Sequence, residues 1–296
     1  MNTAVLFLIF NRPAETRIVL EQLRRQQVRN LYVAADGPRA NNEKDIRNCA
    51  ECRELIDSID WDCNVVKLFR NENLGCGRAV SDAITWFFSH EEMGIILEDD
   101  CLPSDSFFMF CSTLLHYYKN EPGVMHISGD NFQFGKSRGA GTYYFSIYAH
   151  VWGWATWRRA WQLYDFTMKD FPEIIKDSTI RNYYPGNSLA QTYEGKIDTW
   201  DFQWVYTILK NRGLSIIPNV NLVKNIGFNK KSTHTNRAPF WYSKIVTGEI
   251  DEIIHPEKIE IDREADDFTL KNIYLAKESL LNRVLRKITS KFFLYL

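Results

Sequence analysis

The sequence predicts an α/β protein in which a mostly parallel central sheet is flanked by helices. Three observations favour this class. Strand and helix patterns alternate over residues 1–130, the opening apolar run at residues 5–10 is continuous, and polar clusters follow the predicted strand ends. A continuous apolar run is typical of a strand covered on both faces. Strand–helix alternation implies right-handed crossovers, which place helices on both sides of the sheet.

The apolar periodicity gives the predicted elements in order. Pro13 can open the first helix, because proline fits the first helical position, where an N–H group has no helical partner. Val19, Leu20 and Leu23 then share one inner face of that helix. Strands are predicted at residues 5–10, 31–35, 65–69, 94–97 and 124–128, and further helices at residues 43–59, around residues 79–87 and at residues 107–118.

After about residue 130 the pattern changes, and aromatic residues crowd residues 143–161. Most of these rings are expected to be core, with one or two lining a groove. Trp157 and Trp161 are four residues apart, which predicts that they are neighbours on one helix. A helix at residues 199–211 and short strands at residues 214–217 and 221–224 are predicted to follow.

No low-complexity linker or internal repeat divides the chain, which predicts one continuous domain with two lobes. The first lobe is residues 1–130, the second is residues 131–250, and residues 251–296 form a C-terminal helical segment. The last helix is apolar on one face and basic beside it. It either lies on an anionic membrane surface or packs on the domain with its charges in solvent.

The composition excludes several classes of protein. The 296 residues include 36 Lys and Arg against 37 Asp and Glu, a net charge of −1, so a generally basic nucleic-acid-binding protein is excluded and no nucleic-acid partner is expected. The apolar run at residues 4–10 is too short for a membrane span, and it lacks the basic n-region and the small-residue cleavage site of a signal peptide. We therefore expect a cytoplasmic protein with reduced cysteines. Cys49 and Cys52 lack a second pair at zinc spacing and are interpreted as thiols of a helix or the core.

Four polar clusters follow the ends of the first four predicted strands. Ligands of parallel sheets bind beyond the carboxyl ends of the strands, so these loops are expected to build one site. The clusters are Asn11-Arg12, Asp36, Asn73-Leu74-Gly75 and Glu98-Asp99-Asp100.

The cluster Glu98-Asp99-Asp100 places three carboxylates at the end of a buried strand. Their repulsion is costly unless a cation or strong hydrogen bonds compensate for it. A hard divalent cation would do so, because it prefers oxygen ligands and keeps positions open for phosphate oxygens. The alternative is a cluster that ends the strand and favours the N-terminus of the next helix.

Two residues of the second lobe are also candidates for chemistry. Asp201 lies between Trp200 and Trp204 at the start of a helix, where partial desolvation would raise its pKa toward that of a general base. The alternative is a carboxylate that the helix dipole favours at this position. His234 follows Gly227 in a polar loop and is either a ligand of a metal or phosphate or an ordinary exposed histidine.

Taken together, these residues resemble the nucleotide-sugar glycosyltransferases of the Rossmann-like GT-A fold. They resemble in particular bacterial surface-polysaccharide transferases related to N-acetylglucosaminyltransferase I. The resemblance covers residues 4–240 and depends on the order of short motifs. These are Asn11-Arg12-Pro13, Asp36-Gly37-Pro38-Arg39, Asn73-Leu74-Gly75, Leu97-Glu98-Asp99-Asp100, Trp152-Gly153-Trp154 and the stretch from Gly227 to His234.

The resemblance implies a role for each candidate residue. The acidic cluster is similar to a DXD-type motif, although Glu98 takes its first position and the two aspartates are adjacent. By this likeness Asp100 and His234 hold Mn²⁺ or Mg²⁺, and Asp99 contacts the ribose or the water shell of the ion. Asp36 reads the nucleobase edge, in a base pocket lined by Phe10, Asn11 and Arg12. Arg78, with Asn73 and Gly75, faces the diphosphate or donor sugar, and Asp201 is the acceptor-side base.

The implied activity is metal-dependent transfer of a hexosyl or N-acetylhexosaminyl group. The donor is a nucleotide-sugar, with UDP-sugars favoured, and the acceptor is a hydroxyl of a glycan or lipid-linked saccharide. The transfer is expected to invert the anomeric centre, in surface polysaccharide synthesis at the inner face of the membrane. A non-catalytic carbohydrate-binding protein is one alternative. A sugar-nucleotide pyrophosphorylase is another, although the residues after the first strand lack its glycine-rich basic loop.

Overall fold

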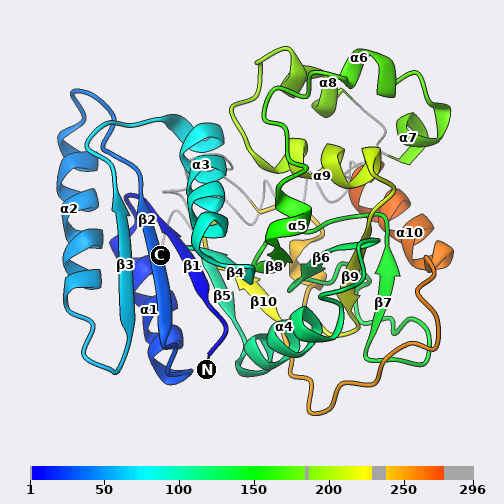
Figure 1. The fold of residues 1–296 in the computed structure, drawn as a ribbon, viewed down its shortest axis with the longest axis horizontal. Coiled ribbons are helices and arrows are strands. Elements are labelled where there is room, and N and C mark those ends of the chain that lie inside the picture. Colours follow the sequence, from blue (N-terminus) through cyan, green and yellow to red (C-terminus); the bar gives the residue numbers. More distant parts are fainter. Residues whose placement is uncertain (1, 184–186, 229–237, 277–296) are drawn as a thin grey trace, which may run out of the picture.

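The computed structural model describes residues 2–183, 187–228 and 238–276. One large sheet runs through both lobes, with helices on its two faces (Figure 1). Its strands are joined by more parallel than antiparallel pairings. The predicted class, an α/β protein with a mostly parallel central sheet flanked by helices, is confirmed.

Strands of the described residues form the large sheet and a small antiparallel one. They are β1 (Val5–Ile9), β2 (Asn30–Ala35), β3 (Asn64–Phe69), β4 (Met93–Glu98), β5 (Cys101–Pro103), β6 (Val124–Ser128), β7 (Tyr143–Ser146), β8 (Trp154–Trp157), β9 (Leu214–Pro218) and β10 (Val223–Asn225). The order in the large sheet is β3-β2-β1-β4-β8-β6-β9-β7, and β10 pairs with β5. β3, β2, β1 and β4 are parallel, whereas β8 is antiparallel to both β4 and β6.

The helices of the first lobe are long, and several of those in the second lobe are single turns. The long ones are α1 (Pro13–Arg25), α2 (Glu43–Asp57), α3 (Gly75–His90), α4 (Asp105–Tyr117) and α9 (Asp201–Lys210). The short ones are α5 (Arg158–Trp161), α6 (Phe171–Ile174), α7 (Ser178–Tyr183), α8 (Ser188–Tyr193), α10 (Arg263–Thr269), the 3₁₀ helix η1 (Tyr242–Lys244) and the π-helix η2 (Leu270–Tyr274).

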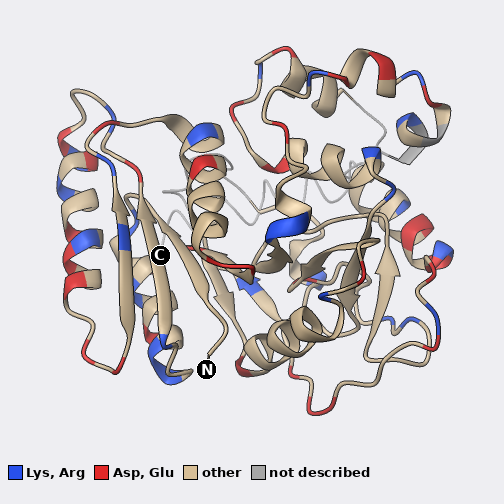
Figure 2. Ribbon diagram, viewed as in Figure 1, with Lys and Arg blue, Asp and Glu red and all other residues tan. Residues whose placement is uncertain are grey.

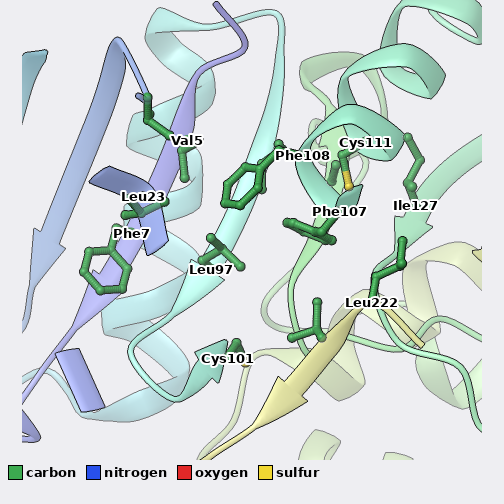
Figure 3. Close-up of a cluster of buried hydrophobic side chains, with 14 of the residues drawn as sticks. Val5, Phe7, Leu23, Leu97, Cys101, Phe107, Phe108, Cys111, Ile127 and Leu222 are labelled. Carbon is green, nitrogen blue, oxygen red and sulfur yellow. The ribbon is translucent and has the colours of Figure 1, made fainter. Parts of the chain in front are cut away.

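The continuous apolar run of β1 serves two cores, one on each face of the sheet. Side chains alternate along a strand, so Val5, Phe7 and Ile9 join a core with α1, α2 and α4 (Figure 3). Leu6 and Leu8 join the other core, with α3, α5 and α9. This double burial is the physical reason why the run reads as apolar without alternation.

The outer helices separate charge from the core as the periodicity predicts. Val19, Leu20 and Leu23 of α1 are buried. Figure 2 shows Lys, Arg, Asp and Glu along α2 and toward the end of α1, while the strands carry few charges. Cys49 and Cys52 are buried free thiols of α2, in agreement with the sequence analysis.

The strand order brings the predicted clusters to one edge of the sheet. β1 lies between β2 and β4 and is parallel to both, so the loops after these strands leave the sheet on the same side. The chain winds in opposite directions from β1, which makes the gap between β1 and β4 the switch point where ligands bind in such sheets.

One prediction about the second lobe is wrong. Trp157 and Trp161 do not share a helix, because Trp157 ends β8 and α5 begins at Arg158. Within β8, Trp154 and Trp157 point to opposite faces of the sheet, into different cores. The expectation that most rings are core is confirmed. Three of the four indoles in residues 143–161, those of Trp154, Trp157 and Trp161, expose 4% or less of their surface.

The predicted helix at the end of the chain and the loop with His234 lie outside the described residues. Among the residues that are described, every helix is too short or too polar to cross a bilayer. The membrane contact of the C-terminal segment therefore stays a prediction.

A buried polar network centres on His126 of β6 and joins it to Trp204 and His150 of the second lobe. The Trp204 indole N–H donates to Nδ1 at 3.1 Å, so the ring proton is on Nε2, which donates to the His150 carbonyl oxygen at 2.8 Å. Ser128 Oγ donates to the same oxygen at 3.0 Å. Only a neutral imidazole can make these contacts, and burial lowers the pKa of His126 and of His150 to about 3.

Acid is expected to destabilise the fold through these two histidines. Between their ordinary pKa of 6.5 and the folded value of about 3, the unfolded chain binds protons that the folded chain does not. Stability therefore falls as the pH falls through this window, by roughly 1 kcal/mol per pH unit for each histidine. Urea unfolding of the His126→Gln variant at pH 5 and 7 should show a smaller loss. The exposed His90→Gln is the control, and an unchanged loss in His126→Gln would contradict the prediction.

Candidate functional site

A cavity of about 710 Å³ lies at the switch point and is lined by residues of both lobes. It brings together Arg12, Glu98 and Asp100 from the first lobe and Asp201 from the second. The other candidate residues of the described chain do not line it. These are Phe10, Asn11, Asp36, Asn73, Gly75, Arg78 and Asp99.

Arg12 joins the ends of β1 and β4. Its guanidinium contacts Asp99 Oδ1 at 2.5 Å and Asp100 Oδ2 at 2.6 Å. Burial lowers the pKa of Arg12, but the charges of Asp99, Asp100 and Glu98 outweigh this and hold the pKa above its ordinary value. Part of the cationic compensation that the acidic cluster requires therefore comes from the chain itself.

The three carboxylates of the cluster have different surroundings. Asp99 is buried, and its Oδ2 also accepts the Phe10 backbone N–H at 3.3 Å. Glu98 and Asp100 line the cavity. Burial raises the pKa of Glu98 and of Asp99, and the charge of Asp100 raises both further. Glu98 and Asp100 therefore face the cavity, whereas Asp99 lies beside it and is held by Arg12 and the Phe10 backbone.

The oxygens of Glu98 and Asp100 fit a hard divalent cation. The only hydrogen bond described for Asp100 Oδ1 comes from the Cys101 thiol at 3.5 Å, a weak donor. Mg²⁺ and Mn²⁺ prefer carboxylate oxygens and keep water and phosphate oxygens as further ligands. The described residues contain no group of three or more His, Cys, Asp or Glu arranged as ligands, and His234, the other predicted ligand, lies outside them.

The segment of the second lobe around Gly227 lies in close contact with Asp100. The backbone N–H of Ile226 donates to the Asp100 carbonyl oxygen at 2.7 Å, and Asn225 of β10 pairs with Cys101 of β5. A Cβ at Gly227 would lie 2.1 Å from Asp100 Oδ2. Only glycine permits this approach without moving the carboxylate.

Asp36 is buried, and the loop after β3 uses its carboxylate. Oδ1 accepts the backbone N–H of Gly37 at 3.0 Å and that of Leu74 at 3.1 Å, and Oδ2 accepts Asn73 Nδ2 at 2.9 Å. Burial raises the pKa of Asp36, although these hydrogen bonds oppose the rise. The parallel strands bring Asp36 and Asn73 together as expected, and the contact of Asp36 with a nucleobase stays a prediction.

Asp45 of α2 anchors the loop after β1 and is not among the site residues predicted from the sequence. Asp45 is 1% exposed and accepts Asn11 Nδ2 at 2.7 Å and Arg39 Nη2 at 2.9 Å. The Arg39 guanidinium in turn lies 5.8 Å from the centroid of the Phe10 ring. The only sequence signal was an acidic residue in the first turn of a predicted helix, which the helix dipole alone explains.

Arg78 and Gly75 lie near the start of α3. Arg78 is exposed, and its guanidinium lies 4.1 Å from the centroid of the Phe166 ring. Gly75 has a φ of +81°, which glycine adopts without the steric cost of a side chain. Their contacts with the diphosphate or the donor sugar stay predictions.

Asp201 is the first residue of α9 and faces the cavity from the second lobe. Its Oδ1 accepts the Thr199 hydroxyl and the backbone N–H of Phe202, the latter at 2.9 Å. Trp200 and Trp204 are 2% and 0% exposed, so buried indoles flank Asp201 in the chain as the sequence analysis expected. The Asp201 carboxylate is therefore held in place at the N-terminus of α9, where it lines the cavity.

Aromatic rings form one wall of the cavity. The Trp152 and Trp241 rings lie 6.2 Å apart at an interplanar angle of 24°. Phe132 and Phe228 pack edge-on against Trp152, at 5.2 and 5.4 Å between centroids. Trp152 and Trp241 are half-buried, so both retain surface toward the cavity.

Asp130 contributes to the same wall and was also missed. It is fully buried, and neither carboxylate oxygen has a hydrogen bond of normal geometry. Burial raises its pKa well above the ordinary value, and the backbone N–H groups of Asp130 and Trp152 offset only part of this rise. A sequence signal for Asp130 was present, because Gly129-Asp130 follows the predicted strand at residues 124–128 in the same way as the four polar clusters follow theirs.

Comparisons with known proteins add a likeness at the level of solved structures. No protein-family model matches the chain, and no curated protein matches it. A structure of the galactosyltransferase LgtC with donor and acceptor sugar analogues is 13% identical, with 95% of this chain and 99% of that chain covered and a TM-score of 0.39. Mouse xyloside xylosyltransferase 1 is 14% identical, with 71% and 82% covered and a TM-score of 0.36.

A cytidylyltransferase from Leptospira borgpetersenii is 13% identical, with 60% of this chain and 73% of that chain covered and a TM-score of 0.35. TM-scores and identities this low do not assign a function, so the function has to be argued from the residues that line the cavity.

Proposed function

We propose that the chain is a glycosyltransferase of the GT-A type. It moves a sugar from a nucleotide-diphosphate donor, with UDP-sugars favoured, to a hydroxyl of a glycan or lipid-linked saccharide. One observation carries the proposal: a single cavity holds Arg12, Glu98 and Asp100 on one side and Asp201 on the other. Sugar transfer from a diphosphate needs charge compensation for the leaving group and a carboxylate for the attacking hydroxyl.

On the donor side, Asp100 would hold Mn²⁺ or Mg²⁺, with Glu98 beside it. A bound ion supplies Lewis-acid neutralisation of the leaving diphosphate. Arg12 adds a fixed positive charge within 2.6 Å of both Asp99 and Asp100. The remaining donor contacts are proposed as the resemblance implies. Asp99 contacts the ribose or the water shell of the ion, and His234 completes the metal or phosphate site. The nucleobase lies among Phe10, Asn11, Arg12 and Asp36, and the diphosphate or sugar faces Asn73, Gly75 and Arg78.

On the acceptor side, Asp201 takes the proton of the acceptor hydroxyl. The hydroxyl oxygen forms a bond to the anomeric carbon while the bond from that carbon to the diphosphate oxygen breaks, so the centre is inverted. Trp152 and Trp241 offer aromatic faces on which the apolar face of a sugar ring can stack. Bacterial surface polysaccharide synthesis on the cytoplasmic face of the membrane is the setting we propose for this reaction.

The aromatic wall also supports a second candidate, a carbohydrate-binding protein without turnover. Such a protein needs Trp152 and Trp241 but has no use for Asp201 beside a diphosphate site. Release of the nucleotide from a nucleotide-sugar separates the two candidates, because only the enzyme performs it.

The first test is a thermal-shift panel of UDP-, GDP-, CMP- and dTDP-sugars with and without Mn²⁺. We expect one nucleotide class to raise the melting temperature in a metal-dependent way, because a ligand of the folded state stabilises it by about 2.7 kcal/mol at 100 times Kd. The same nucleotide-sugar should then release its nucleotide on incubation. If none of the four classes gave a metal-dependent shift, the proposal would be wrong.

A further inference from the structure

Asp198 fastens the loop that carries Asp201 to the first lobe. Its Oδ1 accepts the Gly77 backbone N–H at 2.9 Å, and its Oδ2 accepts the Cys76 N–H at 3.0 Å. These donors belong to the first turn of α3, where backbone N–H groups have no partner within the helix. The helix dipole favours a carboxylate there as well.

Two glycines make room for this contact. A Cβ at Gly75 would lie 2.6 Å from Asp198 Oδ2. A Cβ at Gly77 would lie 2.7 Å from Asp198 Oδ1 and 2.8 Å from the Thr199 carbonyl oxygen. The close approach of the second lobe therefore explains why glycine stands at both positions at the start of α3.

The segment from Asp198 to Asp201 is short and held at both ends. The Thr199 hydroxyl donates to Asp201 Oδ1, and Gln203 Nε2 donates to the Thr199 carbonyl oxygen at 2.8 Å. Once Asp198 is seated on α3, the Asp201 carboxylate has little freedom relative to the sheet. Asp198 and Asp201 both line the cavity.

We propose that Asp198 is a positioning residue for sugar transfer: by docking on the start of α3 it sets the place of Asp201 relative to Asp100. This inference rests on the proposed function, in which Asp201 takes the proton of the attacking hydroxyl. Asp198 touches none of the reacting atoms and acts only through Asp201. A displacement of about 1 Å at a reacting group can cost on the order of 100-fold in rate.

Glu249 provides a matched control. Its Oε1 and Oε2 accept the backbone N–H groups of Asp105 and Ser106, at 3.3 and 2.8 Å, at the start of α4. It is thus also a carboxylate from a distant segment that binds two N–H groups of a helix N-terminus, but it does not line the cavity. A merely structural role for Asp198 predicts the same behaviour for the two residues.

The test compares Asp198→Asn, Glu249→Gln, Asp201→Asn and the double variant Asp198→Asn/Asp201→Asn. The probe is the UDP-sugar that gives the largest Mn²⁺-dependent thermal shift with the wild type, and UDP release is measured. We expect Asp198→Asn to lower kcat by roughly 10- to 100-fold with the donor KM within about twofold. Glu249→Gln should lower the melting temperature but keep kcat. The double variant should be no slower than Asp201→Asn alone.

Gly77→Ala tests the same contact if Asp198→Asn folds poorly. Alanine is the better helix former, yet its Cβ would push Asp198 away, so kcat should fall here too. Gly123→Ala is its control, because a Cβ there would meet only Glu121 Oε1, at 3.7 Å.

Wild-type kcat in Asp198→Asn, or a further loss in the double variant, would overturn the inference while leaving the proposed function standing. No nucleotide-dependent shift and no UDP release in the wild type would overturn both.

Discussion

Replacing Asp201 by asparagine is expected to lower kcat for sugar transfer by a factor on the order of 10³, because a positioned general base contributes roughly 10²- to 10⁴-fold. The amide oxygen can still accept the Thr199 hydroxyl and the Phe202 N–H, so the local structure should persist. The charge that receives the proton is lost. Steady-state kinetics measure the loss of turnover, and a thermal shift with the donor measures donor binding. The thermal shift should match that of the wild type.

Asp105→Asn is the control for this variant. Asp105 is likewise the first residue of its helix, α4, but it is exposed and lies outside the cavity lining. Its replacement should leave kcat unchanged. If Asp201→Asn kept kcat and raised only the acceptor KM, Asp201 would bind the acceptor and the inverting mechanism would be wrong.

Replacing Asp100 by asparagine is expected to remove metal-dependent donor binding and to lower turnover by on the order of 10³, because a Lewis acid supplies several kcal/mol at the leaving group. The asparagine keeps one side-chain oxygen but loses the negative charge that Asp100 presents to the cavity. Two measurements report it: the Mn²⁺-dependent thermal shift with the donor, which should vanish, and the rate of nucleotide release.

Chelation checks the same prediction without a mutation. EDTA should lower wild-type turnover to about the level of Asp100→Asn, and added Mn²⁺ or Mg²⁺ should restore only the wild type. EDTA should have no further effect on the variant. Wild-type turnover that persists in EDTA would show that Arg12 and the rest of the chain compensate for the diphosphate without an ion.

The strands and helices of the first lobe could be predicted from the sequence because each depends on a pattern of neighbouring residues. The predicted strand at residues 124–128 coincides with β6, and Pro13 opens α1 as expected. The contact between Asp36 and Asn73 follows from two adjacent parallel strands that end together. In each case the spacing of apolar residues and the polar residues that follow them in the chain are enough to predict the element.

The second lobe was harder because its determinants are contacts between distant residues. Trp157 and Trp161 have helical spacing, yet pairing with β4 places Trp157 in a strand. The contacts of Gly227 with Asp100 and of Asp198 with Gly77 join residues more than 100 positions apart, and no local pattern predicts them. The acidic cluster was recognised, but its bond to Arg12 was not, since nothing in the spacing of the two segments specifies a salt bridge.

The antiparallel strand β8 also limits how the molecule can move. It belongs to the second lobe and pairs with β4 and β6 of the first, so a ladder of backbone hydrogen bonds crosses the boundary between the lobes. A hinge at that boundary would have to break this ladder, unlike closure in enzymes whose domains share only a linker. In the proposed reaction, admission of substrate and escape of product would therefore depend on movements of segments outside the sheet, while the sheet itself keeps its geometry.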